Sequence, residues 1–265
     1  MKTALPDVTL SELDGVRYLH LGSIWVQGAM RIRKPQVVEL DYIQRMLAGL
    51  LWLPTETLGQ GRALQLGLGA AALTRFTHKA LHMATTVVEL NPQVVAACRD
   101  WFHLPREVEV VLCDAGAWLR ERAAPQSVRL LHVDLYDQDA AAPVLDDEAF
   151  YADCRRVLDD GGVASINLFG RDASFARSLA HIVAAFGAAH VCSLRATREG
   201  NTVVVATRDA PLPPREQLLA RARALELRFK ALGLAARQWP RLLRPVPSPA
   251  GEGEGADGEA RQKQA

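Results

Sequence analysis

The first 36 residues show the alternation of apolar and polar side chains that is typical of antiparallel strands. Residues 16–21 and 24–32 fit two such strands, and Gly22 and Ser23 provide a turn between them. From residue 38 to residue 53 the apolar positions instead recur at helical spacing, which predicts one helix. The pattern therefore predicts a small antiparallel β unit over residues 1–36 that leads into a helix.

Beyond residue 61, short apolar runs alternate with amphipathic segments. The runs predict seven strands, at residues 63–67, 85–90, 108–113, 128–134, 162–168, 189–195 and 201–207. The other segments predict helices, at residues 70–80, 92–102, 115–123, 146–158, 172–186 and 214–232. Strands that alternate with helices form a mostly parallel sheet that is covered on both faces, and residues 198–201 suit a hairpin turn between the last two strands. We therefore expect an α/β domain over residues 37–240.

The composition changes near the end of the chain. Pro, Gly, Glu, Ala and Gln dominate there and cannot bury a core, so residues 241–265 are expected to be disordered. The whole chain is 49% hydrophobic and 23% charged, which suits a soluble globular protein. A net charge of +1 gives no electrostatic case for binding nucleic acid or a membrane surface. No apolar run reaches the roughly 18 residues of a membrane-spanning helix.

The cysteines favour neither a metal site nor a disulfide framework. Four are present, and their spacing is irregular: Cys98, Cys113, Cys154 and Cys192. Cys113 falls in a predicted buried strand, where a thiol is inert. We therefore expect a cytoplasmic protein that contains no bound metal.

The first strand of the α/β domain runs into a glycine turn. Gly67 and Gly69 follow residues 63–66, and the small helix-forming residues 70–72 come directly after them. By itself this turn is also compatible with a strand-to-helix connection that binds nothing. The next strand, however, ends at Glu89, twenty positions after Gly69, and a carboxylate at that spacing can accept both hydroxyls of a ribose. Together the two features favour a nucleoside-binding site.

Acidic residues follow the next two strands as well. Asp114 and Ala115 come after the third strand, and Asp134, Tyr136 and Asp137 come after the fourth. In a parallel sheet these positions meet at one edge, where ligands bind. Asp114 is also suited to cap a helix, and Asp137 to lie in a solvated loop. Two neighbouring carboxylates titrate together, and such a pair can hold a cationic amine or accept its proton.

These residues and motifs resemble those of spermidine synthase and related polyamine aminopropyltransferases, over about residues 14–235. The resemblance implies a Rossmann-like class I methyltransferase fold, with a nucleoside-binding catalytic domain over residues 37–240. It implies decarboxylated S-adenosylmethionine as co-substrate and a polyamine as acceptor. It also places Glu89 on the ribose, Asp114 near the adenine, Asp134 at the attacking amine and Asp137 beside that amine.

The chain departs from the family pattern in its glycine loop. The family's loop usually reads Gly-Gly-Gly-Asp-Gly, whereas this chain has Gly67-Leu-Gly-Ala-Ala. Ala70 therefore stands where the family has an acid that helps to hold the amine of the aminopropyl group. A truncated contact of this kind weakens the recognition of an ammonium group.

A second departure lies in the helix before the central strand. The family commonly has a Tyr-His pair followed by an acid there, and the matching positions are Ile43, Gln44 and Arg45. Arg45 would repel a polyamine if it faced the pocket, and would suit a carboxylate instead. It is equally suited to a solvated helix face.

Three functions therefore stay open from the sequence. The retained acids favour aminopropyl transfer to a small amine, in which Asp134 takes a proton directly or through Tyr136. Ala70 and Arg45 favour an S-adenosylmethionine-dependent methyltransferase with another small acceptor. The altered amine site favours a catalytically inactive nucleoside-binding protein. The β unit would form a homodimer contact, as in the resembled family.

Overall fold

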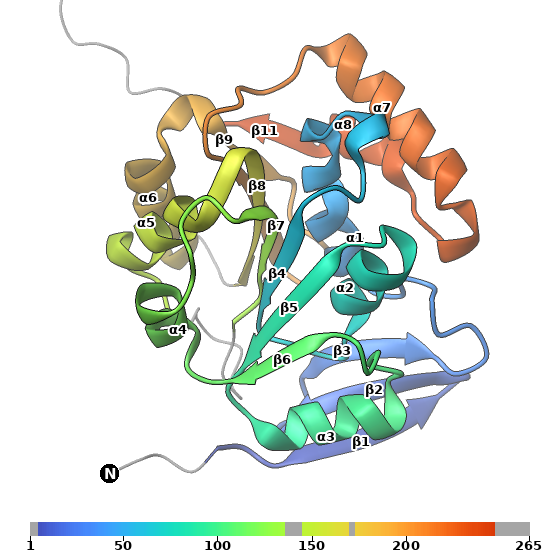
Figure 1. Cartoon of the computed structure of the whole chain (residues 1–265). Helices are drawn as coiled ribbons and strands as arrows, with labels where there is room; N and C mark the ends of the chain where they lie inside the picture. Colours follow the sequence, from blue (N-terminus) through green and yellow to red (C-terminus); the bar gives the residue numbers. More distant parts are fainter. Residues whose placement is uncertain (1–4, 136–144, 170–172, 247–265) are drawn as a thin grey trace, which may run out of the picture.

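The computed structural model describes residues 5–135, 145–169 and 173–246, which form two sheets and the helices around them (Figure 1). The smaller sheet is antiparallel, with β1 (Val8–Leu13), β2 (Val16–Leu21) and β3 (Val26–Arg31) in that order. The sequence predicts two of these strands and misses β1. Most of the β1 side chains are exposed, so no buried face imposes an alternation of apolar and polar residues on this strand.

The helix predicted over residues 38–53 is divided into two parts. An α-helix, α1 (Asp41–Met46), is followed by a 3₁₀ helix over Leu47–Trp52. The tighter segment passes close to β8 (Leu158–Phe169). A Cβ atom on Gly49 would lie 2.8 Å from the Ser165 hydroxyl, so only glycine permits this approach.

The large sheet has eight strands, one more than the seven predicted. Its order is β11-β9-β10-β8-β7-β4-β5-β6, and the five strands from β8 to β6 are parallel. These strands are β4 (Arg62–Leu66), β5 (Ala84–Glu89), β6 (Glu109–Leu112), β7 (Val128–Val133), β8, β9 (Val191–Leu194), β10 (Asn201–Thr207) and β11 (Leu243–Pro245). The additional strand β11 lies inside the segment that was expected to be disordered, and it pairs antiparallel with β9. Residues 247–265 lie outside the described part of the chain.

Helices cover both faces of this sheet (Figure 1). The helices of the large domain, besides α1, are α2 (Ala72–Arg75), α3 (Pro92–Trp101), α4 (Ala115–Glu121), α5 (Glu148–Val157), α6 (Ala173–Phe186), α7 (Arg215–Arg228) and α8 (Trp239–Leu242). One hydrophobic core joins α4, α5 and α6 to the sheet, and another joins α1 and α7 to its opposite face. None of the helices among the described residues is long and apolar enough to cross a membrane.

The chain reverses its direction across the sheet between β4 and β7. From β4 it moves outward to β5 and β6, and it then returns to β7 on the other side of β4. Ligands bind at such a switch point in open α/β sheets. The two backbones are very close there, because a Cβ atom on Gly67 would lie 2.1 Å from the carbonyl oxygen of Asp134. Gly67 also has a φ of 83°, so both space and conformation require glycine.

A buried arginine connects the glycine loop to its surroundings. The Arg75 guanidinium donates hydrogen bonds to the carbonyl oxygens of Pro35, Ala70 and Phe102, at 3.1, 2.7 and 2.5 Å. Burial lowers the pKa of Arg75 to about 10, which leaves it charged at neutral pH. Three carbonyl dipoles thus hold the cation, and the cation in turn fixes the loop that follows β4.

Candidate active site

Asp134 follows β7 at the switch point and is held from three sides. Its backbone N–H donates to the Leu66 carbonyl at 2.9 Å. Its Oδ1 accepts a hydrogen bond from Asn167 Nδ2 at 2.8 Å, and its Oδ2 accepts one from the Tyr42 hydroxyl at 3.3 Å. Burial raises the pKa of Asp134 to about 6, although the two hydrogen bonds favour the carboxylate. The carboxyl group therefore changes its charge close to neutral pH.

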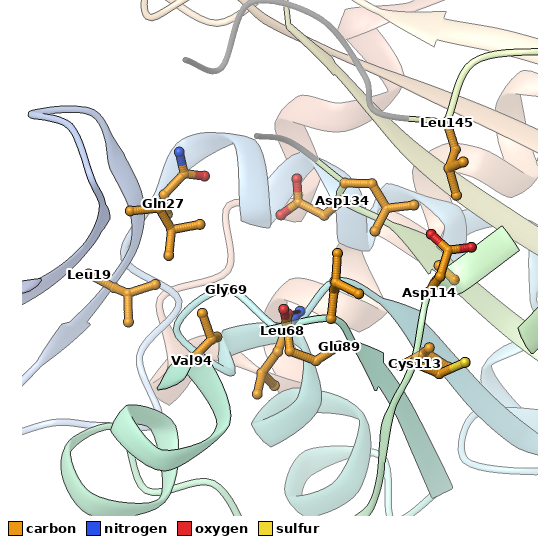
Figure 2. Close-up of a pocket in the computed structure, with 16 residues that line it drawn as sticks. Leu19, Gln27, Leu68, Gly69, Glu89, Val94, Cys113, Asp114, Asp134 and Leu145 are labelled. Atoms are coloured by element: carbon orange, nitrogen blue, oxygen red, sulfur yellow. Dashed lines mark hydrogen bonds between the residues drawn. The ribbon is translucent and has the colours of Figure 1, made fainter. Parts of the chain in front are cut away.

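A first cavity, of about 110 Å³, lies over the glycine turn (Figure 2). We call it the glycine-loop cavity. Asp134 lines this cavity. So do all five residues that the sequence predicts to bind the co-substrate, which are Gly67, Gly69, Glu89, Asp114 and Ala115. The fold thus brings together the residues that the acidic strand ends and the glycine turn indicate.

Glu89 is positioned by the backbone on both sides of it. Its Oε2 accepts a hydrogen bond from Leu68 N and its Oε1 one from Asn91 N, each at 2.8 Å. Burial raises the pKa of Glu89, and these N–H groups act against that shift. Each carboxylate oxygen keeps a further lone pair, so Glu89 can still accept two hydroxyl groups.

The end of β6 contributes Asp114, which serves two purposes. Its Oδ1 accepts a hydrogen bond from Ala117 N at 2.8 Å and so caps α4, while the side chain also lines the glycine-loop cavity. Cys113 lines this cavity as well. The prediction that Cys113 lies in a buried strand is wrong, because β6 is the edge of the sheet and ends at Leu112.

Gln27 of β3 is a site residue that the sequence analysis missed. Its backbone carbonyl lies 3.1 Å from the position of a Cβ atom on Gly69, and its side chain reaches into the glycine-loop cavity opposite Asp134 (Figure 2). The Gln27 Nε2 atom is buried and finds no hydrogen-bond partner among the described residues. A buried donor without a partner is costly and is therefore suited to a ligand. The sequence does contain a signal for this contact, because a glycine in the interior of a strand, here Gly28 in β3, marks a close approach of another backbone.

A second, larger cavity of about 580 Å³ opens on the other side of Asp134 and Gln27. We call it the aromatic cavity. It is lined by four aromatic and four acidic side chains among others: Tyr18, Trp25, Tyr42 and Phe169, and Glu39, Asp41, Asp134 and Glu199. Trp25 and Phe169 meet edge to face, with 6.3 Å between their ring centroids. Such a surface attracts cations.

Helix α1 contributes Asp41 and Tyr42 to the aromatic cavity, and not the residues that the resemblance indicates. Ile43 is buried in the core. Gln44 donates to the Val38 carbonyl and accepts from Ala235 N. Arg45 is only 12% exposed, pairs with Asp41 at 2.7 Å and donates to the Arg195 carbonyl. Arg45 therefore neither enters the aromatic cavity nor lies on a solvated face.

Two of the predicted catalytic residues, Tyr136 and Asp137, lie outside the described residues. The described part of the chain contains no group of three or more His, Cys, Asp or Glu side chains arranged to hold a metal ion. Its cysteines are free thiols.

Comparison with known proteins agrees with this geometry. No protein-family model matches the sequence. Solved structures share the fold: a probable spermidine synthase from Corynebacterium glutamicum has a TM-score of 0.71 at 19% identity, over 97% of this chain and 95% of that chain. Human methyltransferase-like protein 13, in complex with SAH, has a TM-score of 0.63 at 23% identity, over 72% of this chain and 93% of that one.

The sequence relatives are more specific. A polyamine aminopropyltransferase of Chromobacterium violaceum is 34% identical over 231 residues, which are 85% of this chain and 86% of the relative. The corresponding protein of Neisseria meningitidis is 30% identical over 246 residues, 89% of this chain and 91% of the relative. With this similarity over nearly the whole chain, and with acids at the ends of β5, β6 and β7, the chain belongs to the polyamine aminopropyltransferase family.

Proposed function

We propose that this protein transfers the aminopropyl group of decarboxylated S-adenosylmethionine to a polyamine acceptor. The observation that carries the proposal is the position of Asp134. This residue lines both the glycine-loop cavity and the aromatic cavity. A nucleoside in the first cavity and an amine in the second would meet at its carboxylate, and such positioning supplies much of the rate of a two-substrate reaction.

The charges in the glycine-loop cavity support the decarboxylated form of the co-substrate. Among the described residues that line it, three carry carboxylates and none is cationic: Glu89, Asp114 and Asp134. The carboxylate of intact S-adenosylmethionine would therefore find no cationic partner among the described residues of this cavity. Arg45, which the sequence offered as its partner, is held by Asp41 and the Arg195 carbonyl. The Gln27 side-chain amide offers a polar contact near the place of the missing acid at Ala70.

The aromatic cavity supports an acceptor with more than one positive charge. Arg31 pairs with Glu39 and Arg45 with Asp41, but neither arginine lines the cavity. The structure shows no ion pair for Glu199 among the described residues, so this carboxylate is available at the exposed rim. A polyamine can thus place a neutral amine at Asp134 while another ammonium group lies among the carboxylates and rings.

The proposed chemistry assigns one role to Asp134. The attacking amine must lose a proton as its nitrogen forms a bond to the carbon beside the sulfonium, and the C–S bond breaks to release neutral methylthioadenosine. Asp134, with a pKa near 6, is ionised at neutral pH and can accept that proton. Tyr136 and Asp137 keep their proposed roles as a proton intermediary and an amine ligand.

The direct test is product formation. Purified protein with decarboxylated S-adenosylmethionine and putrescine, cadaverine or spermidine should release methylthioadenosine together with the extended amine, measured by chromatography and mass spectrometry. Intact S-adenosylmethionine in place of the decarboxylated form should yield neither product. Methylation of an acceptor, or the absence of methylthioadenosine with every amine, would refute the proposal.

The rate should also depend on pH through Asp134. Because the carboxylate is the active form, kcat/KM for the donor should rise as the pH increases through about 6. Protonation of the amine adds its own dependence at higher pH, which every variant shares. A profile measured from pH 5 to pH 9 should therefore show an acidic limb that Asp134→Asn lacks. The same limb in Asp134→Asn would exclude Asp134 as its origin.

A further inference from the structure

A chain of side-chain amides runs from the start of β10 to the carboxylate of Asp134. Asn201 Nδ2 donates a hydrogen bond to Asn167 Oδ1 at 3.2 Å, and Asn167 Nδ2 donates one to Asp134 Oδ1 at 2.8 Å. Asn167 and Asn201 are diagonal neighbours on one face of the antiparallel pair β8 and β10, because Asn167 stands opposite Val203. The three side chains thus form one continuous row across the aromatic cavity.

The direction of this row follows from the chemistry of its two ends. An ionised carboxylate only accepts hydrogen bonds, so Asn167 must turn its NH₂ group toward Asp134. Its carbonyl oxygen then faces Asn201 and needs a donor, which Asn201 supplies. If Asn167 were reversed, its carbonyl oxygen would face Asp134, and only a protonated Asp134 could donate to it.

We propose that Asn201 is a positioning residue for the transfer reaction, which acts through Asn167 to hold the Asp134 carboxyl group in its ionised, proton-accepting form. This inference rests on the proposed function of the site. Asn201 itself is placed by its backbone, since its N–H donates to Thr197 Oγ1 at 3.1 Å and its carbonyl accepts from Thr197 N at 2.8 Å. Its side chain can therefore be replaced without the loss of the contacts that begin β10.

Other groups near Asp134 do not replace this contact. The Tyr42 hydroxyl donates to the other oxygen, Oδ2. His132 precedes Asp134 on the same face of β7, and burial lowers its pKa to about 3, so it stays neutral. The remaining titratable side chains that line the two cavities are Tyr18, Glu39, Asp41, Glu89, Cys113, Asp114 and Glu199. Burial is the cause that raises the pKa of Asp134, and the hydrogen bond from Asn167 acts against it.

The test is the titration of Asp134 in variants of Asn201. Protein labelled with ¹³C at the aspartate carboxyl carbons is titrated by NMR without substrates, and the Asp134 signal is assigned by its loss in Asp134→Asn. Asn201→Ala removes the donor without adding charge and should raise the midpoint by about 0.5 to 1 pH unit. Asn201→Asp presents only acceptors to Asn167 and should raise it by about 1 unit or more. Thr202→Val, at the next position of β10, should leave it unchanged.

The acidic limb of kcat/KM should move upward by the same amounts in the two Asn201 variants, while a merely structural defect would lower the rate at every pH. An unchanged Asp134 midpoint in folded Asn201→Ala would overturn the proposal. The titration requires no turnover, so it tests the role of Asn201 independently of product formation. A wild-type protein that forms no methylthioadenosine would instead refute the proposed function.

Discussion

Replacement of Asp134 by asparagine should lower kcat for aminopropyl transfer by about 10²- to 10⁴-fold, which is the usual contribution of a positioned general base. The substitution keeps the size of the side chain but removes the charge and the ability to accept a proton. Binding of the donor should change little, because Glu89 and the glycine turn provide the contacts at the other end of the cavity. Steady-state kinetics combined with calorimetric titration of the donor would separate the two effects.

A suitable control for this variant is Asp153→Asn. Asp153 lies on α5 and pairs with Arg156 at 3.1 Å, away from both cavities, so its replacement should leave kcat unchanged. A loss of less than about tenfold in Asp134→Asn would show that another group accepts the proton.

The second large effect is expected for Glu89→Gln. This substitution should weaken the binding of methylthioadenosine by about 100-fold, since hydrogen bonds to a charged group contribute about 1.5 to 3 kcal/mol each. A glutamine would also turn its NH₂ group toward the N–H of either Leu68 or Asn91, which both donate to Glu89 now. Isothermal titration calorimetry with methylthioadenosine measures the change directly.

Glu109→Gln is the matched control for that measurement. Glu109 begins β6 at the opposite end of the strand from Asp114, and it accepts a hydrogen bond from Thr86. Its replacement should leave nucleoside affinity unchanged. If Glu89→Gln binds methylthioadenosine within about threefold of the wild type, Glu89 does not hold the ribose.

The glycine-loop cavity was predictable because it depends on local rules. A glycine turn after a buried strand, and an acid at the end of the next strand, specify their own positions once the sheet is parallel. Gly67, Glu89 and Asp134 therefore lie where the spacing of the sequence indicates. The alternation of strands and helices predicts the parallel sheet. Strand β11 was missed because three residues before a Pro- and Gly-rich tail carry no periodic signal.

The lining of the aromatic cavity could not be predicted because it depends on the exact start of one helix. The family pattern indicates Ile43 and Gln44, but α1 begins at Asp41 and turns Tyr42 toward Asp134. A shift of one residue rotates a helical side chain by about 100°, and helix boundaries are the least certain part of a sequence prediction. The environment of Arg45 could not be predicted for a different reason, because its partner Arg195 lies 150 residues away in the chain.

The close contact between β3 and the glycine loop restricts how the site can evolve. A Cβ atom on Gly28 would lie 2.5 Å from the Cβ of Ala70, and the space beside Ala70 is only about 10 Å³, which is the least that a water molecule needs. An aspartate at position 70 would collide with β3 or displace Gln27, and it would add a carboxylate to the space that Asp134 already lines. The single substitution Ala70→Asp is therefore not expected to produce a working loop of the family's usual type. A larger side chain in the glycine loop therefore requires a compensating substitution in β3, so the two segments are expected to vary together.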